Sequence, residues 1–218
     1  MCGRFAQSKP VIEYAHALDP AWEPPPLDLT PTWNMAPSRQ VLVFHESSEG
    51  RVAEFLRWGF LPSWAEPDAQ KPINARVESA SSKPYFRHAW KSGRCLIPAD
   101  GWYEWQVTSH GKQPCFIHRS DNQPVLLAGL YEFNPQVNTR SFTILTTEAK
   151  GALREVHERE PLALSSEAGR EWIHRDLAAD RIKELVSEPL GSEHFSWYAI
   201  STRVNSPRND GPELLKPA

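Results

Sequence analysis

The chain has 218 residues, of which 40% are apolar and 23% charged, and its 9 Trp and 9 Phe exclude the composition of a disordered protein. A folded protein of one or two domains is expected, and no apolar run approaches the roughly 20 residues that a membrane-spanning helix requires. Acidic residues (27) outnumber basic ones (24), and the net charge of −3 excludes a general electrostatic attraction to nucleic acid, so any such role needs a local basic patch.

The predicted elements, in chain order, are short. A helix is expected over residues 10–18, where apolar residues recur at helical spacing. Strands rich in β-branched and aromatic residues are expected over 41–45, 53–60, 94–98, 102–107, 114–119, 125–130, 140–147 and 195–201. Further helices are expected over 85–91, 148–156 after Thr147 as N-cap, 167–174 after Ser166, and 180–186.

This order of elements predicts a single α+β domain over residues 1–218. We expect it to be mainly antiparallel, as packed sheets or an open barrel, with several short helices on the outside. Residues 206–218 are expected to form an irregular tail.

One segment is locally basic. Between Lys71 and Arg94 the chain carries six basic residues and a single acid, Glu78. This stretch indicates either a patch that binds nucleic acid or an ordinary solvated surface whose balancing acids lie nearby in space.

The three cysteines have no CxxC spacing, which argues against both a disulfide framework and a zinc knuckle. Cys95 and Cys115 are expected to be small buried residues in strands. Cys2 differs because Met1 is readily removed before a small residue. The new terminus would then carry an α-amine with a pKa of about 7.7–8.0 beside a thiol of about 8.5, so both groups would be partly nucleophilic at neutral pH. Such a residue supports amide cleavage or condensation with an aldehyde to give a thiazolidine.

Four motifs accompany this terminus: residues 1–5 (MCGRF), 72–78 (PINARVE), 98–105 (PADGWYEW) and 156–161 (VHEREP). Together with 33–37 (WNMAP), 58–60 (WGF), 201–202 (ST) and 204–205 (VN), they span nearly the whole chain, which thereby resembles the SOS-response-associated peptidase family. This family includes the animal hydroxymethylcytosine-binding, embryonic-stem-cell-specific protein. The resemblance implies covalent crosslinking to abasic sites in single-stranded DNA, through a thiazolidine formed by the terminal cysteine.

The resemblance also implies roles for four residues. Cys2 matches the nucleophile exposed by autocatalytic removal of Met1, and Asn74 matches the residue that orients the terminal amine and the sugar. Glu104 matches the acid–base residue, and its aromatic neighbours would raise the pKa of its carboxyl group. His157 matches the residue that protonates or stabilises the sugar oxygen as the ring opens, a task suited to a group that titrates near neutrality.

Five further positions are expected to bind DNA. Arg4, Arg76 and Arg159 fall in the matching motifs and would contact phosphates, while Pro37 and Trp64 would stack on or wedge beside bases at about 1–3 kcal/mol per base. The sequence departs from the family pattern in the loop that carries Trp64 and at Glu160. That acid lies near the expected phosphate path, where it would weaken binding or point elsewhere.

Two other functions remain open on the sequence. One is a cysteine peptidase or N-terminal nucleophile amidohydrolase that uses Cys2, His157 and Glu104; the other is a noncovalent binder of modified or single-stranded DNA. No cofactor and no metal are expected. The partner is expected to be single-stranded DNA containing abasic sites, the chain to be a monomer, and its location to be the cytoplasm, because the first residues lack the layout of a signal peptide.

Overall fold

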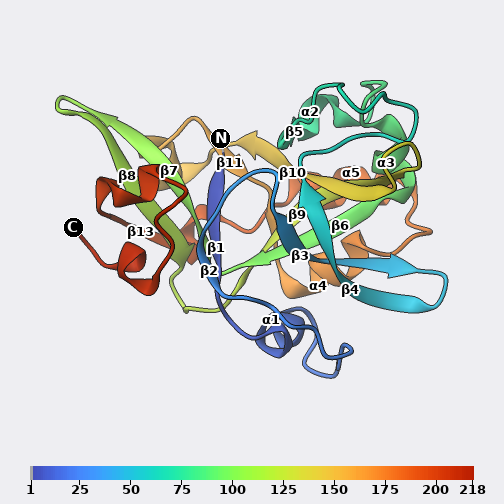
Figure 1. The fold of residues 1–218 in the computed structure, drawn as a ribbon, viewed down its shortest axis with the longest axis horizontal. Helices are drawn as coiled ribbons and strands as arrows, with labels where there is room; N and C mark the ends of the chain where they lie inside the picture. Colours follow the sequence, from blue (N-terminus) through green and yellow to red (C-terminus); the bar gives the residue numbers. More distant parts are fainter. Residues whose placement is uncertain (1) are drawn as a thin grey trace.

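Two sheets form the framework of the protein, for which a computed structural model describes residues 2–218 (Figure 1). The smaller sheet has the order β13-β8-β7-β1-β2. Its strands are β1 (Arg4–Gln7), β2 (Thr32–Met35), β7 (Gly101–Thr108), β8 (Gly111–Arg119) and β13 (Phe195–Ala199). All of its pairings are antiparallel. The hairpin of β7 and β8 extends away from the body at the upper left of Figure 1.

The larger sheet has the order β11-β10-β4-β3-β6-β9-β12, and β10 pairs with β9 as well, so five of its strands close into a ring. Its strands are β3 (Gln40–Ser47), β4 (Gly50–Trp58), β5 (Asn74–Arg76), β6 (Arg94–Ala99), β9 (Val125–Asn134), β10 (Thr139–Glu148), β11 (Arg159–Pro161) and β12 (Ala163–Leu164). Only the pairings of β10 with β4 and β5 are parallel. The prediction of a mainly antiparallel α+β domain is therefore confirmed, with a closed ring in place of an open barrel.

Apolar residues fill both faces of this larger sheet. Val41 and Val43 pack in a core shared with Phe5 and Trp102 of the smaller sheet. Leu42 and Phe44 point the other way, into a second core that includes helical residues. Successive side chains of a strand face opposite sides, so a strand buried on both faces has an unbroken apolar run, as in residues 41–44 and 125–130.

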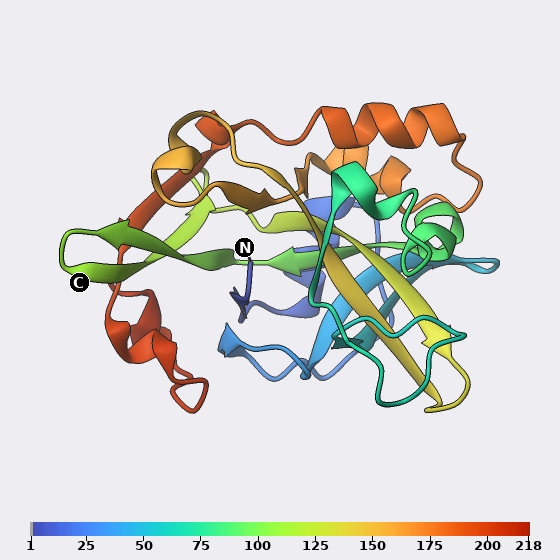
Figure 2. The same cartoon turned by 90° about the horizontal axis from the view of Figure 1, so that it is seen from above.

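Short helices cover the second core. They are α1 (Val11–Leu18), α2 (Val77–Ala80), α3 (Arg87–Ser92), α4 (Ser166–Trp172) and α5 (Ala179–Ser187). Figure 2 shows α5, in orange, along one side of the sheet. The helix expected over 167–174 begins one residue earlier than predicted. The N-cap is Ser165 and not Ser166, because the Ser165 hydroxyl accepts a hydrogen bond from the Ala168 amide. No helix among residues 2–218 is long and apolar enough to cross a membrane.

The predicted helix over 148–156 is wrong. Strand β10 continues through Glu148 because β11 pairs with it, and Lys150 is extended. Gly151 then has φ = +51°, a left-handed conformation that side-chain-bearing residues rarely adopt, and only a 3-10 turn, η1 (Gly151–Glu155), follows.

Residues 206–218 are more ordered than the predicted irregular tail. They contain a 3-10 turn, η4 (Pro212–Leu215), and Pro217 forms an isolated bridge with Ile200. A carboxylate oxygen of Asp210 accepts hydrogen bonds from the Trp33 and Asn34 amides at 2.6 and 3.1 Å. The segment therefore packs on β2, and tertiary contacts that no local pattern encodes give it its order.

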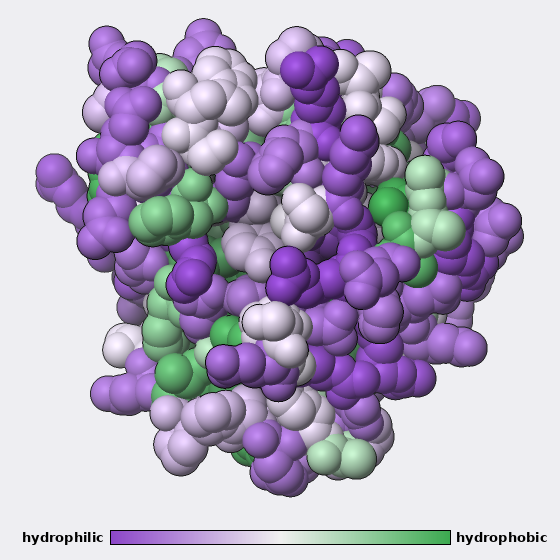
Figure 3. Space-filling view, turned by 90° about the vertical axis from the view of Figure 1, so that its right-hand side faces the viewer, coloured by the Kyte–Doolittle hydropathy of each residue, from purple (hydrophilic) through white to green (hydrophobic). Residues whose placement is uncertain are grey.

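One of the six basic residues between Lys71 and Arg94 does not belong to the surface. Arg94 is buried, and its guanidinium donates hydrogen bonds to five backbone carbonyls of residues 90, 91, 172, 174 and 175. It ties the ends of α3 and α4 together. The face of the molecule on the right of Figure 1 is mainly hydrophilic, with scattered apolar side chains (Figure 3).

Candidate active site

Cys2 lies where β1 enters the smaller sheet. Arg4 pairs with Tyr103 and Phe5 with Trp102, so the backbone before β1 continues beside β7, the strand that carries Glu104. Phe5 and Trp102 are both buried in the shared core and fix this register. Cys2 itself is fully buried and packs in the same core, with Cys95 and Cys115 buried in β6 and β8 as the sequence predicts.

Asn74 reaches Cys2 from the other sheet. It is the first residue of β5, which pairs in parallel with residues 144–146 of β10. The Asn74 side-chain amide donates a hydrogen bond of 2.8 Å to the Cys2 carbonyl oxygen. A side chain 72 positions away thereby holds the backbone of residue 2, and the expected juxtaposition of these two residues is present.

Glu104 and His157 complete a cluster with Cys2. Glu104 is 2% exposed, and burial raises the pKa of its carboxyl group, an effect that the nearby His157 counteracts. His157 lies between η1 and β11, and its Nδ1 accepts a hydrogen bond of 2.9 Å from the Arg159 amide. Its Nδ1 also lies 3.1 Å from the Arg159 carbonyl oxygen, so contacts with the Arg159 backbone hold the imidazole in place. The cluster therefore combines a desolvated carboxyl group with an oriented imidazole.

The thiol of Cys2 differs from the expectation for an exposed terminus. Burial, and then the charge of Glu104, raise the pKa of this thiol well above its usual range. In the chain that carries Met1 it is therefore protonated at neutral pH, and no α-amine exists because the nitrogen of Cys2 is part of a peptide bond. Nucleophilic chemistry at this residue requires both a base and a cut before Cys2.

Arg4 is held by the C-terminal segment. Its guanidinium donates to Asn34 Oδ1 at 2.7 Å and to the carbonyls of Val204 and Asn205 at 3.1 and 3.4 Å. Asn34 is fully buried, and its own amide donates to the carbonyls of residues 204, 206 and 209. Asn34 belongs to the motif at residues 33–37, but the sequence assigned it no task. The contact of Arg4 with phosphate stays a prediction.

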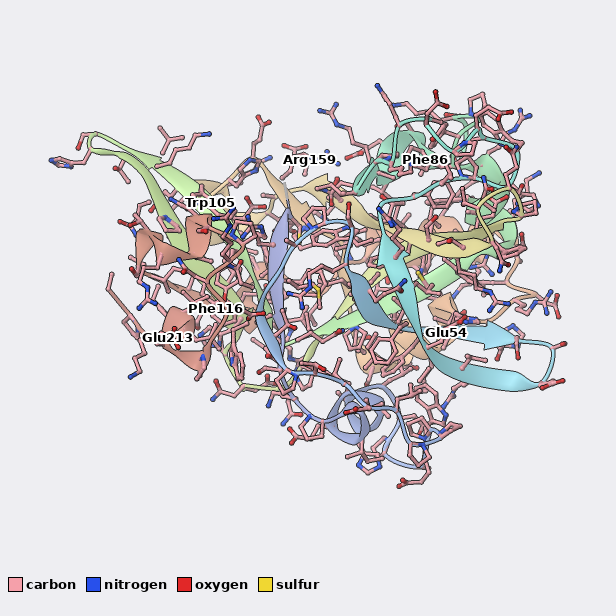
Figure 4. All side chains as sticks on the ribbon, viewed as in Figure 1. Glu54, Phe86, Trp105, Phe116, Arg159 and Glu213 are labelled. Carbon is pink, nitrogen blue, oxygen red and sulfur yellow. The ribbon has the colours of Figure 1, made fainter. Side chains whose placement is uncertain are left out.

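Arg76 and Arg159 meet in a groove of about 510 Å³. The residues that line it, here called the arginine groove, are Arg76, Glu148, Arg154, Glu158 and Arg159. Arg159 forms a bidentate ion pair with Glu78 at 2.7 and 3.0 Å, and this pairing lowers the pKa of the Glu78 carboxyl group. Figure 4 shows Arg159 near the start of β1 in that view. The structure thus brings two of the three predicted arginines together beside His157.

Glu160 does not line the groove. It lies opposite Thr147 in the β10–β11 pairing and is 7% exposed. Burial raises the pKa of its carboxyl group to about 7. Of the two outcomes considered for this acid, the structure therefore favours the one in which it points away from the phosphate path.

Trp64 and Pro37 lie in loops. Trp64 is 58% exposed in the loop after β4, with its ring edge-on to Tyr85. Two residues of β9 hold that loop in place. The Asn134 side chain donates hydrogen bonds to the carbonyls of Pro62 and Ala65, and the Ser63 amide donates one to the Glu132 carboxylate. Pro37 is half-buried in the turn between β2 and β3. An exposed indole on a fixed loop is suited to stacking, but contact with DNA stays a prediction for both residues.

Within residues 2–218, no group of three or more His, Cys, Asp or Glu side chains is arranged to hold a metal ion. The chemistry that this arrangement supports directly is that of a buried cysteine, an amide, a carboxyl group and an imidazole, with basic side chains alongside.

Comparison with known proteins places this arrangement in a family. The profile of the SOS response associated peptidase (SRAP) family matches residues 1–207. The chain is 36% identical to the abasic site processing protein YedK of Escherichia coli strain K12 over the full length of both chains. It is 30% identical to the abasic site processing protein HMCES of Gallus gallus, with 86% of this chain and 66% of that protein covered.

Solved structures agree. A phage-related protein from Bordetella bronchiseptica superposes with a TM-score of 0.79 at 32% identity, covering 92% of this chain and 95% of the other. A Bacteroides thetaiotaomicron protein shares the fold over the full length of both chains, with a TM-score of 0.85 at 21% identity. This chain belongs to the SRAP family.

Proposed function

We propose that this protein senses and shields abasic sites in single-stranded DNA by forming a thiazolidine crosslink through Cys2. The observation that carries the proposal is the position of Cys2. Its carbonyl is bound by Asn74, which stands two residues before the groove residue Arg76 on β5, and the charge of the buried Glu104 carboxyl group acts on its thiol. Its relatives in Escherichia coli and Gallus gallus are named for abasic site processing, which supports the same substrate.

The first step is hydrolysis of the bond between Met1 and Cys2 within the same chain. Water adds across this amide, methionine leaves, and Cys2 gains an α-amine. The SRAP family name supports such peptidase chemistry. The carboxyl group of Glu104, whose pKa burial raises toward neutrality, is placed to accept and return protons in this step.

The second step joins the amine to the lesion. The amine attacks the aldehyde carbon of the ring-opened sugar, one molecule of water leaves, and an imine forms. The sulfur of Cys2 then attacks the imine carbon, and the thiol proton passes through Glu104 to the nitrogen that the attack makes basic. Cysteine and aldehyde have then given a thiazolidine and water. His157, whose imidazole is oriented by the Arg159 backbone, is suited to protonate the sugar oxygen as the sugar ring opens.

A side reaction follows from the imine. Before sulfur closes the ring, the imine acidifies the adjacent carbon of the sugar, and β-elimination of the 3′ phosphate would cleave the strand. Weak lyase activity is therefore part of the proposal. It should be largest when residue 2 keeps its amine and loses its sulfur.

The test has two measurements on the purified chain. Intact mass should show the loss of one methionine, and incubation with single-stranded DNA bearing one abasic site should give a shifted band on a denaturing gel. An oligonucleotide with an intact base at that position is the control and should give none. An unshifted DNA band, with Met1 absent, would reject the crosslink. Turnover of amide substrates without DNA would favour a general peptidase, and binding that salt fully reverses would favour a noncovalent binder.

A further inference from the structure

The arginine groove contains one arginine, Arg154, that was not among the residues expected to bind DNA. Arg154 lies in η1 and lines the groove, and its side chain is 60% exposed. The motifs in the sequence do not include it. Its surroundings show what it can do.

Three arginines converge on the end of strand β10. Arg76 of β5 pairs with Thr146, and Arg159 of β11 pairs with Glu148, so these two flank the strand end from either side. Arg154 covers the same end: its Nε donates a hydrogen bond of 2.8 Å to the Ala149 carbonyl. Strand pairing thus fixes the backbone positions of Arg76 and Arg159, and the hydrogen bond to Ala149 holds the side chain of Arg154.

The groove is joined to the Cys2 cluster through β5. Asn74, which binds the Cys2 carbonyl, and Arg76 are two residues apart on this strand. Side chains at this spacing point to the same side and lie roughly 6.6 Å apart along the strand. A DNA strand whose abasic sugar reaches Cys2 therefore has its neighbouring phosphates within reach of the groove.

Two of the groove arginines have a carboxylate partner. Arg159 pairs with Glu78, and Arg154 Nη2 pairs with Glu148, whose side chain is 67% exposed. An ion pair as exposed as that of Arg154 and Glu148 is weak, and a phosphate can replace the carboxylate without desolvating a bare charge. Arg154 is therefore available to exchange one anion for another.

We propose that Arg154 is a further DNA phosphate ligand of this protein and that Glu148 competes with the phosphate for it. The inference rests on the function proposed above. It extends that function by adding a contact beyond the lesion, on the η1 side of the groove, and a carboxylate that lowers affinity for the strand.

The experiment measures equilibrium binding of a short single-stranded oligonucleotide carrying a tetrahydrofuran in place of the abasic sugar. This analogue has no aldehyde, so no crosslink obscures the equilibrium. The variant Arg154→Gln is compared with Arg181→Gln, an exposed arginine on α5 that is likewise paired with carboxylates, those of Glu171 and Glu184. Fluorescence anisotropy is recorded over a salt series from about 50 to 200 mM.

Loss of one phosphate contact lowers the slope of log affinity against log salt by about 0.7 for a single strand. We expect this change for Arg154→Gln and none for Arg181→Gln. In the second arm, Glu148→Gln should strengthen binding about two- to fivefold at low salt, the range that release from an exposed ion pair allows, while Glu184→Gln should leave it unchanged.

Two results would overturn the inference: an Arg154→Gln slope equal to that of Arg181→Gln, or no gain in affinity for Glu148→Gln. Failure of the proposed function looks different, because the unmodified protein would then fail to crosslink an oligonucleotide with a true abasic site. If it does crosslink and Arg154→Gln behaves like the α5 control, only the role of Arg154 is rejected.

Discussion

The cluster around Cys2 and the arginine groove lie next to each other and are built in opposite ways. In the cluster, Cys2 and Glu104 are almost fully buried, and burial raises the pKa values of both. In the groove, Arg154 and Glu148 are more than half exposed and neutralise each other. The cluster can move protons because water is excluded, whereas the groove can exchange anions because water is present.

This difference predicts which measured property each type of substitution should change. Changes in the cluster should alter bond formation and leave affinity intact, and changes in the groove should alter affinity and its salt dependence. Three substitutions test this separation, and each has an outcome that would contradict it. A fourth tests the buried Glu160, which belongs to neither region.

The largest effect is expected for Cys2→Ala. Alanine is small enough for Met1 to be removed and keeps an α-amine, but it has no sulfur to close the ring, so the gel-stable adduct should be lost completely and strand cleavage should rise. A denaturing gel with true abasic DNA measures both. Binding of the tetrahydrofuran oligonucleotide should stay within twofold of the unmodified protein; a gel-stable adduct in this variant would contradict the role of sulfur.

Glu104→Gln should come next. Loss of a positioned proton carrier lowers a rate by about 10²-fold or more, here the single-turnover rate of crosslinking at saturating protein. The raised pKa of Glu104 means that its carboxylate is lost as pH falls, at a higher pH than the usual value near ~4.3, so the unmodified protein should slow on the acid side. The variant should lack this acid limb. Glu155→Gln, at an exposed position of η1, is the control and should keep it.

Arg76→Gln should have a smaller effect, and on a different quantity. Loss of one phosphate contact changes the slope of log affinity against log salt by about 0.7. The affinity of the variant relative to the unmodified protein should therefore fall about fivefold for each tenfold decrease in salt concentration. Crosslinking at saturating protein should keep its rate, because Arg76 lies outside the cluster. A lower saturated rate would show that cluster and groove are coupled.

The smallest effect is expected for Glu160→Gln. The folded-state pKa of Glu160, about 7, lies above the unfolded value near ~4.3, so the unfolded chain releases this proton first. Stability is therefore fully present below about pH 4 and falls as pH rises toward 7, and the melting temperature falls with it. Glutamine should remove this loss. Parallel pH dependence of the melting temperatures of the two proteins between pH 5 and 8 would contradict it.

The sequence predicts the strands best where both faces are buried. Residues 41–45, 94–98 and 125–130 lie within β3, β6 and β9, because an unbroken apolar run leaves a strand few alternatives. Strands β5, β11 and β12 have two or three residues each, and only pairing with distant strands makes them extended. No local pattern could have found them.

The site was predicted through resemblance more than through spacing. Asn74 and Cys2 lie 72 positions apart, and only the parallel pairing of β5 with β10 explains their contact. The helix over 148–156 failed because helix-forming side chains around Gly151 do not reveal its left-handed backbone. Arg94 was counted with the surface charges because its role as a buried donor to five carbonyls depends on the ends of two helices that meet only in the fold.

The contact between Asn74 and the Cys2 carbonyl has a practical consequence for anyone producing this protein. An affinity handle or reporter fused ahead of residue 1 would keep the nitrogen of residue 2 in an amide until the chain itself or an added protease cuts the bond before Cys2. Fusions belong after Ala218, which is exposed, joined by a spacer that preserves the hydrogen bond that the Ala218 amide donates to the Ala199 carbonyl.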